Sequence, residues 1–122
     1  LRLMGEALRT LKMSPDGRIA WVEVTQEILE RTGAKEDHCD GLINYPRSVA
    51  GVEIGILFRE VAEGKIKVGI RSKCRADVNE LAGQFGGGGH RRAAGCLVEG
   101  NIDEVVKQVV LAAEELLRGT NS

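Results

Sequence analysis

The fold is decided by two neighbouring stretches, VEIGILFRE at residues 52–60 and KIKVGIRSK at residues 65–73. In each stretch apolar residues, mostly β-branched, recur at every second position, which is the period of a β-strand that buries one face. The dipeptide Glu-Gly at 63–64 lies between them and favours a tight turn. We therefore predict an antiparallel hairpin whose second strand presents its basic residues, including Arg71, on the face opposite the core.

Elements on either side of this hairpin follow from caps and periodicity. The fold class that this order predicts is α+β, or mixed α/β: a small mixed β-sheet with a central antiparallel hairpin, covered by helices. We expect residues 34–50, which are polar and contain Pro46, to be irregular. The other predicted elements are a strand at 18–25, a helix from the Thr25 cap to Gly33, a short helix capped by Asp77, a strand at 94–98, and a long helix at 101–118 capped by Asn101 and ended by Gly119.

The size and composition of the chain are those of one compact globular domain. It has 122 residues, of which 43% are hydrophobic and 29% charged, and these fractions are typical of an ordinary globular protein rather than a disordered chain. No apolar run approaches the roughly 20 residues of a membrane helix. We therefore expect a cytoplasmic protein with no membrane partner.

Charge is distributed unevenly along the chain. The formal net charge is −1, yet the segment from Lys65 to Arg92 contains seven basic and two acidic residues. A local basic patch inside a nearly neutral protein indicates a site for an anion rather than general attraction to DNA.

The stretch most informative about chemistry is FGGGGHRRAAG, at residues 85–95. Glycine loses more conformational entropy on folding than any other residue. A run of four therefore indicates either positive φ or a neighbour too close for a Cβ atom. Successive N–H groups in such a bend form an anion-binding nest. His90 and two arginines follow at once, so we interpret the segment as a phosphate-binding loop rather than a flexible linker. It lacks the GK[ST] ending of a P-loop.

The same stretch resembles the signature of the DHH-associated domain, which follows the catalytic domain in DHH-family phosphoesterases of the RecJ-like superfamily. Within this family the chain looks most like the oligoribonuclease and pAp phosphatase group (nanoRNases). Two further stretches support the resemblance, GLINYPRSVAGVE at 41–53 and GKIKVGIRS at 64–72, and together the similarity covers roughly residues 15–118. The resemblance implies a domain at 15–122, with residues 1–14 as a connecting helix from a preceding catalytic domain.

In that family the active site is a cleft between two domains, and two Mn²⁺ ions are held by the catalytic domain. This chain contains no DHH triplet and no His and Asp cluster suited to two metals. The resemblance therefore implies no cofactor, no metal ligand and no catalytic residue in this chain, which alone is expected to be inactive. Its implied partners are short RNA or nucleotide phosphates and the preceding DHH domain, with homo-oligomers left open.

The resemblance also implies which residues bind substrate. The glycines would line a phosphate pocket, His90 would donate to the phosphate or stabilise its charge, and Arg71 would make a second anion or base contact. Gly69 stands where many relatives would carry Ser, so no hydroxyl contact is expected there. The predicted site residues are Gly86, Gly87, Gly88, Gly89, His90 and Arg71, with Arg91, Arg92, Asn44 and Arg47 as less direct cleft residues.

Several functional alternatives stay open at this point. Hydrolysis of short oligoribonucleotides and of 3′-phosphoadenosine 5′-phosphate (pAp) fits the resemblance, while single-stranded DNA and cyclic dinucleotides are further candidate substrates. A non-catalytic RNA-binding module, as in the C-terminal region of alanyl-tRNA synthetase, is the main alternative, although a stacking platform needs more exposed aromatics than four aromatic residues readily supply. An oligomerising domain built on the helix at 101–118 is a third.

Overall fold

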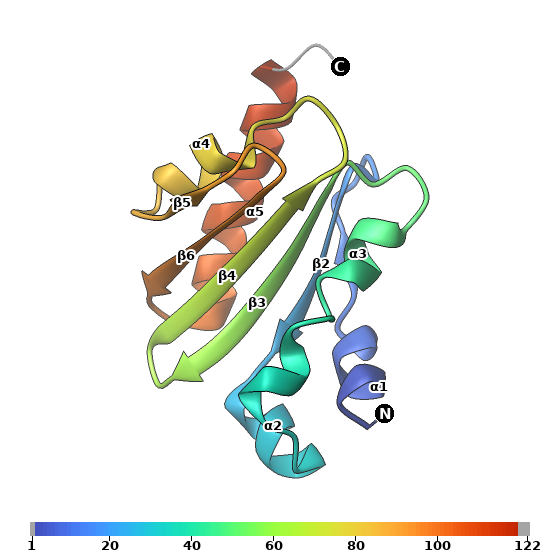
Figure 1. The fold of residues 1–122 in the computed structure, drawn as a ribbon, viewed down its shortest axis with the longest axis vertical. Helices are drawn as coiled ribbons and strands as arrows, with labels where there is room; N and C mark the ends of the chain where they lie inside the picture. The colour runs from blue at the N-terminus through green and yellow to red at the C-terminus, as the bar shows by residue number, and fades with distance from the viewer. Residues whose placement is uncertain (1, 120–122) are drawn as a thin grey trace.

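The structure is a computed structural model that describes residues 2–119. These residues form one sheet with helices on both faces (Figure 1). Leu1 of the predicted connecting helix and the end of the predicted domain, 120–122, lie outside the described residues. In chain order the elements are α1 (Arg2–Arg9), β1 (Lys12–Met13), β2 (Ile19–Val24), α2 (Gln26–Thr32), the 3-10 helix η1 (Glu36–Cys39), α3 (Asn44–Ser48), β3 (Ile54–Ala62), β4 (Lys65–Ser72), α4 (Val78–Gly83), β5 (Gly88–Gly89), β6 (Ala93–Glu99) and α5 (Ile102–Gly119).

Across the described residues the sheet has six strands in the order β1-β2-β3-β4-β6-β5. Strands β2 and β3 are parallel, and every other neighbouring pair is antiparallel, so the sheet is mixed. The β3–β4 hairpin forms its centre, and Gly64 in the connecting turn has a φ of 73°. The predicted fold class is therefore confirmed, including the central antiparallel hairpin.

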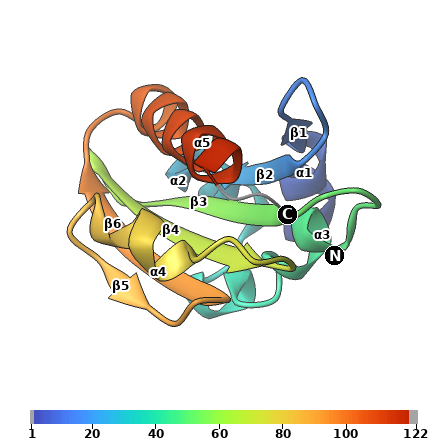
Figure 2. The same cartoon turned by 90° about the horizontal axis from the view of Figure 1, so that it is seen from above.

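The main hydrophobic core lies between one face of the sheet and helices α4 and α5. Alternate residues of β3 and β4, among them Ile56, Phe58 and Ile70, are fully buried there. Helix α5 buries Val105, Val109 and other apolar residues at helical spacing, so its apolar stripe covers this face (Figure 2). Removing apolar surface from water contributes about 25 cal/mol per Å². The burial of these residues therefore supplies much of the hydrophobic stabilisation.

A second core lies on the other face, and it covers only part of the sheet. Helix α1 buries Leu3 and Ala7 against Val22, Leu57 and other residues of this cluster, so the leading segment packs on the domain itself. Whether it also connects to a preceding domain stays a prediction. The helices α1–α3 lie over β2 and β3, while β4 and β6 have no helix in front of them in Figure 1. We call this uncovered part of the sheet the open face.

Local sequence signals located most of the elements. Thr25 caps α2 by accepting a hydrogen bond from the Ile28 N–H, and Gly33 ends that helix in a left-handed conformation. Asn101 accepts from the first amides of α5, and the strand predicted at 94–98 is β6. No helix within residues 2–119 combines the length and apolar character that crossing a membrane requires.

The prediction of irregular structure for residues 34–50 was wrong, because the 3-10 helix η1 and helix α3 both lie there. Pro46 is the third residue of α3. The N–H groups of a helix's first turn have no intrahelical acceptor, so proline removes no hydrogen bond at this position. Proline disrupts a helix at interior positions. Pro46 does not lie at such a position, because α3 has only five residues.

Asp77 provides a test of these local signals. Its carboxylate accepts hydrogen bonds from the N–H groups of Asn79 and Glu80 at the start of α4. Asp77→Ala should lower the free energy of unfolding by about 1 kcal/mol, the usual cost of losing an N-cap. Glu115→Ala, at an exposed position of α5, should change it by less than about 0.5 kcal/mol. Urea denaturation of both variants measures the difference, and equal midpoints would contradict the assigned cap.

Candidate functional site

Arg71 lies on the open face at the end of β4, where three strands are in register. It is paired with Gly55 of β3 on one side and with Ala93 of β6 on the other. Its Nη1 atom donates to the carbonyl oxygen of Ile70 at 3.1 Å, which orients the guanidinium without neutralising it. The predicted site residue Arg71 therefore lies on the part of this face that helices α1–α3 leave uncovered.

The loop that carries His90, Arg91 and Arg92 lies next to this strand end. The N–H of His90 donates to the Ala93 carbonyl at 2.8 Å, which closes a two-residue turn between β5 and β6. The carbonyls of Arg91 and Arg92 accept hydrogen bonds from the N–H groups of Val78 and Ser72, both at 2.9 Å. Because Ser72 follows Arg71, the structure brings the predicted arginines and the imidazole to the same end of the sheet.

The glycine run has a different physical basis from the predicted nest of free amides. The N–H groups of Gly86, Gly87 and Gly89 donate to the Gly83 and Ala82 carbonyls and to the Asn79 side chain. These donors are therefore already used within the chain. A Cβ atom on Gly87 would lie 2.1 Å from the Gly95 carbonyl oxygen. Close approach to β6, rather than amide exposure, is what requires glycine at this position.

Asn44 and Arg47 reach the same region from helix α3. The Arg47 Nη2 atom donates to the Asn44 side-chain oxygen at 2.8 Å, so the two residues form a pair. Helix α3 packs tightly on β3: a Cβ atom on Gly55 would lie 2.7 Å from the Arg47 backbone nitrogen. Since Gly55 is the cross-strand partner of Arg71, the backbone of α3 borders the strand next to Arg71.

We call the five residues Arg47, Arg71, His90, Arg91 and Arg92 the basic rim. Among residues 2–119, none of them forms an ion pair with a carboxylate. The hydrogen bonds of these arginines go instead to neutral groups, such as the Arg75 carbonyl that accepts from Arg91. The charge of the rim is therefore available to an anion, which is the chemistry that the sequence predicted. Phosphate binding itself stays a prediction.

A cavity of about 180 Å³ opens beside Arg71, and sequence reasoning assigned it no role. Its floor is Gly69, and its walls carry Arg59, Lys67 and Asp40 together with the buried Cys39. Burial raises the pKa of the Cys39 thiol, although the neighbouring Arg59 acts in the opposite direction. A raised pKa keeps the thiol neutral at pH 7, so it does not cancel the cations. The alternation of β4 had already indicated that Lys67 is on this face.

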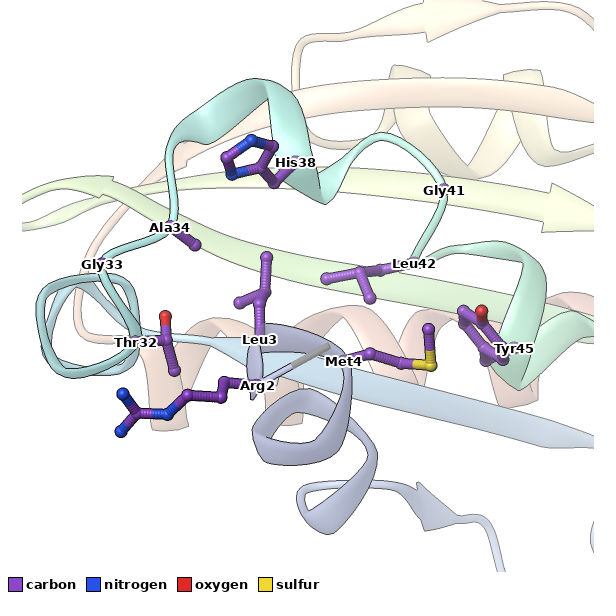
Figure 3. A pocket seen from close by; sticks show the side chains of 10 residues that line it. All are labelled: Arg2, Leu3, Met4, Thr32, Gly33, Ala34, His38, Gly41, Leu42 and Tyr45. Atoms are coloured by element: carbon purple, nitrogen blue, oxygen red, sulfur yellow. The ribbon is translucent and has the colours of Figure 1, made fainter.

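A larger cavity of about 590 Å³ lies between α1, α2, η1 and α3 (Figure 3). Leu3, Met4 and Leu42 point into it, and Tyr45 lies at one end. Its lining is mostly apolar, and none of the predicted site residues belongs to it. The cavity therefore does not coincide with the basic rim.

No group of three or more His, Cys, Asp or Glu side chains within residues 2–119 is arranged to hold a metal ion. The donors that a two-manganese centre needs do not converge in this part of the chain.

Comparison with known proteins gives the family. A family model described as the DHHA1 domain matches residues 19–118, which is most of the chain. This chain belongs to the DHHA1 family. The resemblance inferred from the glycine motif is thereby confirmed, and the match begins at the first residue of β2.

The relatives of this DHHA1 domain include proteins named as phosphoesterases. It is 37% identical over 119 residues to the bifunctional oligoribonuclease and PAP phosphatase NrnA of Thermus thermophilus, with 95% of this chain and 34% of that protein covered. An exopolyphosphatase-related protein from Bacteroides fragilis superposes with a TM-score of 0.86 at 33% identity, over 93% of this chain and 34% of the other. The chain spans about a third of the length of these relatives.

A more distant structure shares the fold. The pGpG-specific phosphodiesterase PggH from Vibrio cholerae matches with a TM-score of 0.58 at 16% identity, over 92% of this chain and 37% of that protein. The arrangement of sheet and helices is therefore retained when most residues differ.

The glycine run can be tested by adding a single carbon. Gly87→Ala should destabilise the DHHA1 domain by about 1–3 kcal/mol, because the new Cβ would also lie 2.6 Å from the Cys96 Cβ atom. Gly83→Ala is the matched control: no atom lies within 4 Å of its Cβ position, and its φ is not positive. Urea denaturation should show a lower midpoint for the first variant only. Equal stability would show that close packing on β6 does not require this glycine.

Proposed function

We propose that this chain is the substrate-binding domain of a manganese-dependent DHH phosphoesterase that hydrolyses short oligoribonucleotides, pAp, or both. The observation that carries the proposal is the basic rim, in which Arg71 adjoins the His90–Arg92 turn without a carboxylate partner among the described residues. The name of the Thermus thermophilus relative supports the choice of substrate class.

The rim is suited to a phosphate group. Arginine presents several N–H donors in a planar fork that matches phosphate oxygens, and such charge-assisted hydrogen bonds are stronger than neutral ones. Hydrogen bonds to the backbone carbonyls of Ile70 and Arg75 hold two of these side chains in place, which reduces the entropy lost on binding. In the whole protein, the metal ions and their ligands belong to the preceding domain, and this domain positions the phosphate.

The aromatic side chains favour this proposal over a general RNA-binding module. Trp21 and Phe58 are buried in the core, and Phe85 is partly buried against it. Tyr45, with 38% of its surface exposed, is the only exposed aromatic in residues 2–119. A platform for successive stacked bases needs several exposed rings. A compact nucleotide bound through its phosphate fits the surface better.

Nucleotide titration tests the binding site. Adding adenosine 5′-monophosphate to the chain should shift the backbone amide signals of Arg71 and residues 89–93 in NMR spectra. Arg71→Met and His90→Ala should each weaken binding about tenfold or more, because a hydrogen bond to a charged group is lost. Lys107→Met, an exposed position of α5 on the covered side, should bind like the wild type. Binding that rises steadily with oligonucleotide length would favour the RNA-binding module instead.

The division of labour between domains is tested by activity. With Mn²⁺ and either pAp or a dinucleotide, the 122-residue chain should release no product above the rate without protein, as chromatography of the nucleotides would measure. The physical reason is that residues 2–119 assemble no group of three metal-binding side chains. Turnover that scales with chain concentration through successive purification steps would contradict the assignment of catalysis to the preceding domain.

A further inference from the structure

Two basic residues face each other directly across β3 and β4, at the border of the open face. Arg59 of β3 and Lys67 of β4 are cross-strand partners in the antiparallel hairpin. Like charges at such positions destabilise a sheet, because their Cβ atoms are only about 5 Å apart. Neither residue forms an ion pair with a carboxylate within residues 2–119. The structure therefore keeps an unfavourable charge pair at the centre of its sheet.

A β-bulge creates this pair. Ala62 pairs with Lys65 beside the turn, and the register then shifts by one residue between Glu60 and Ala62. Without the shift, Lys67 would lie opposite Glu60 and could form a favourable pair. With it, the Glu60 carboxylate instead accepts a hydrogen bond from the Gln26 N–H at the start of α2, at 2.9 Å. The bulge thus moves Glu60 away from the position opposite Lys67 and places Arg59 at that position.

The two cations line the cavity that adjoins the basic rim. Arg59 donates from Nη1 to the Glu36 carbonyl at 2.9 Å, so it is oriented by a neutral acceptor and keeps its charge. Asp40 is the single carboxylate among the described lining residues, against the three cations Arg59, Lys67 and Arg71. The surplus of positive charge in a cavity of about 180 Å³ favours an anionic group.

The surface of β4 between the Arg59–Lys67 pair and the basic rim is unobstructed. A Cβ atom built on Gly69 meets no atom within 4 Å, so the peptide surface between Lys67 and Arg71 is open. The Cα atoms of these two residues are about 13 Å apart along the strand, since each residue advances about 3.3 Å. Long side chains at both ends can reach inward from there. A ligand with two phosphate groups separated by a nucleoside can contact both ends.

We propose that Arg59 and Lys67 form a second anion subsite, which binds a phosphate group one nucleoside away from the phosphate at the basic rim. The inference rests on the proposed function, because it takes the rim as the first phosphate site. It assigns a ligand class: nucleotides that carry phosphates on both sides of a nucleoside, such as pAp or a 5′-phosphorylated dinucleotide. A nucleoside monophosphate uses the rim alone.

The test compares one phosphate with two. Calorimetric titrations of the chain with adenosine 5′-monophosphate and with pAp, at equal ionic strength, should show tighter binding of pAp. Arg59→Met and Lys67→Met should each reduce the ratio of the two affinities about three- to tenfold, while monophosphate binding stays within about twofold of the wild type. Lys107→Met should leave both affinities unchanged. Because Lys67 is exposed and its removal relieves repulsion, Lys67→Met should unfold at or above the wild-type temperature.

Each remaining outcome would overturn the second subsite, either alone or together with the proposed function. If the affinity ratio is unchanged in both variants while the monophosphate still binds at the rim, the second subsite is wrong and the proposed function stands. If both variants weaken the two nucleotides equally, Arg59 and Lys67 belong to the first site and no second subsite exists. If neither nucleotide binds the wild-type chain, the proposed function fails and the subsite with it.

Discussion

The register of β4 between β3 and β6 is the constraint on which the rest of the structure depends. Side chains alternate along a strand, so a slip of one residue would turn Arg71 into the core and Ile70 into solvent. The aliphatic residues of β3 and β4 that pack on α5 prevent this slip, because exposing them would lose several kcal/mol of hydrophobic stabilisation. The charges of the open face are thus fixed by the apolar residues of the opposite face.

The glycine run shows how one sequence signal can have two physical meanings. Four glycines next to a histidine indicate either exposed amides or close packing, and both readings predict a turn near the basic residues. The structure separates them: most of these amides have acceptors within the chain, and Gly87 lies against β6. What the run supplies is a tightly packed β5 that holds the His90–Arg92 turn beside Arg71. In the proposed function the basic groups, rather than the amides, attract the phosphate.

Prediction from the sequence succeeded where the signal is local. Caps such as Thr25, Asp77 and Asn101 and the alternation of the hairpin depend on residues a few positions apart, and the structure contains each of them. The two-residue strand β5 and the Arg59–Lys67 pair were missed, because both depend on partners chosen by tertiary packing. The bulge before Ala62 decides whether Lys67 meets an acid or a base, and no single residue in the sequence marks it.

The open face is positive because of where acids are placed, not because of overall composition. The chain has a net charge of −1, but its carboxylates have other uses: Glu53 pairs with Arg18, Glu23 with Lys12, and Asp77 and Glu60 accept from helix amides. Screening limits the interaction between exposed charges to about 8 Å at physiological salt. Distant acids therefore do not cancel the cations of the open face.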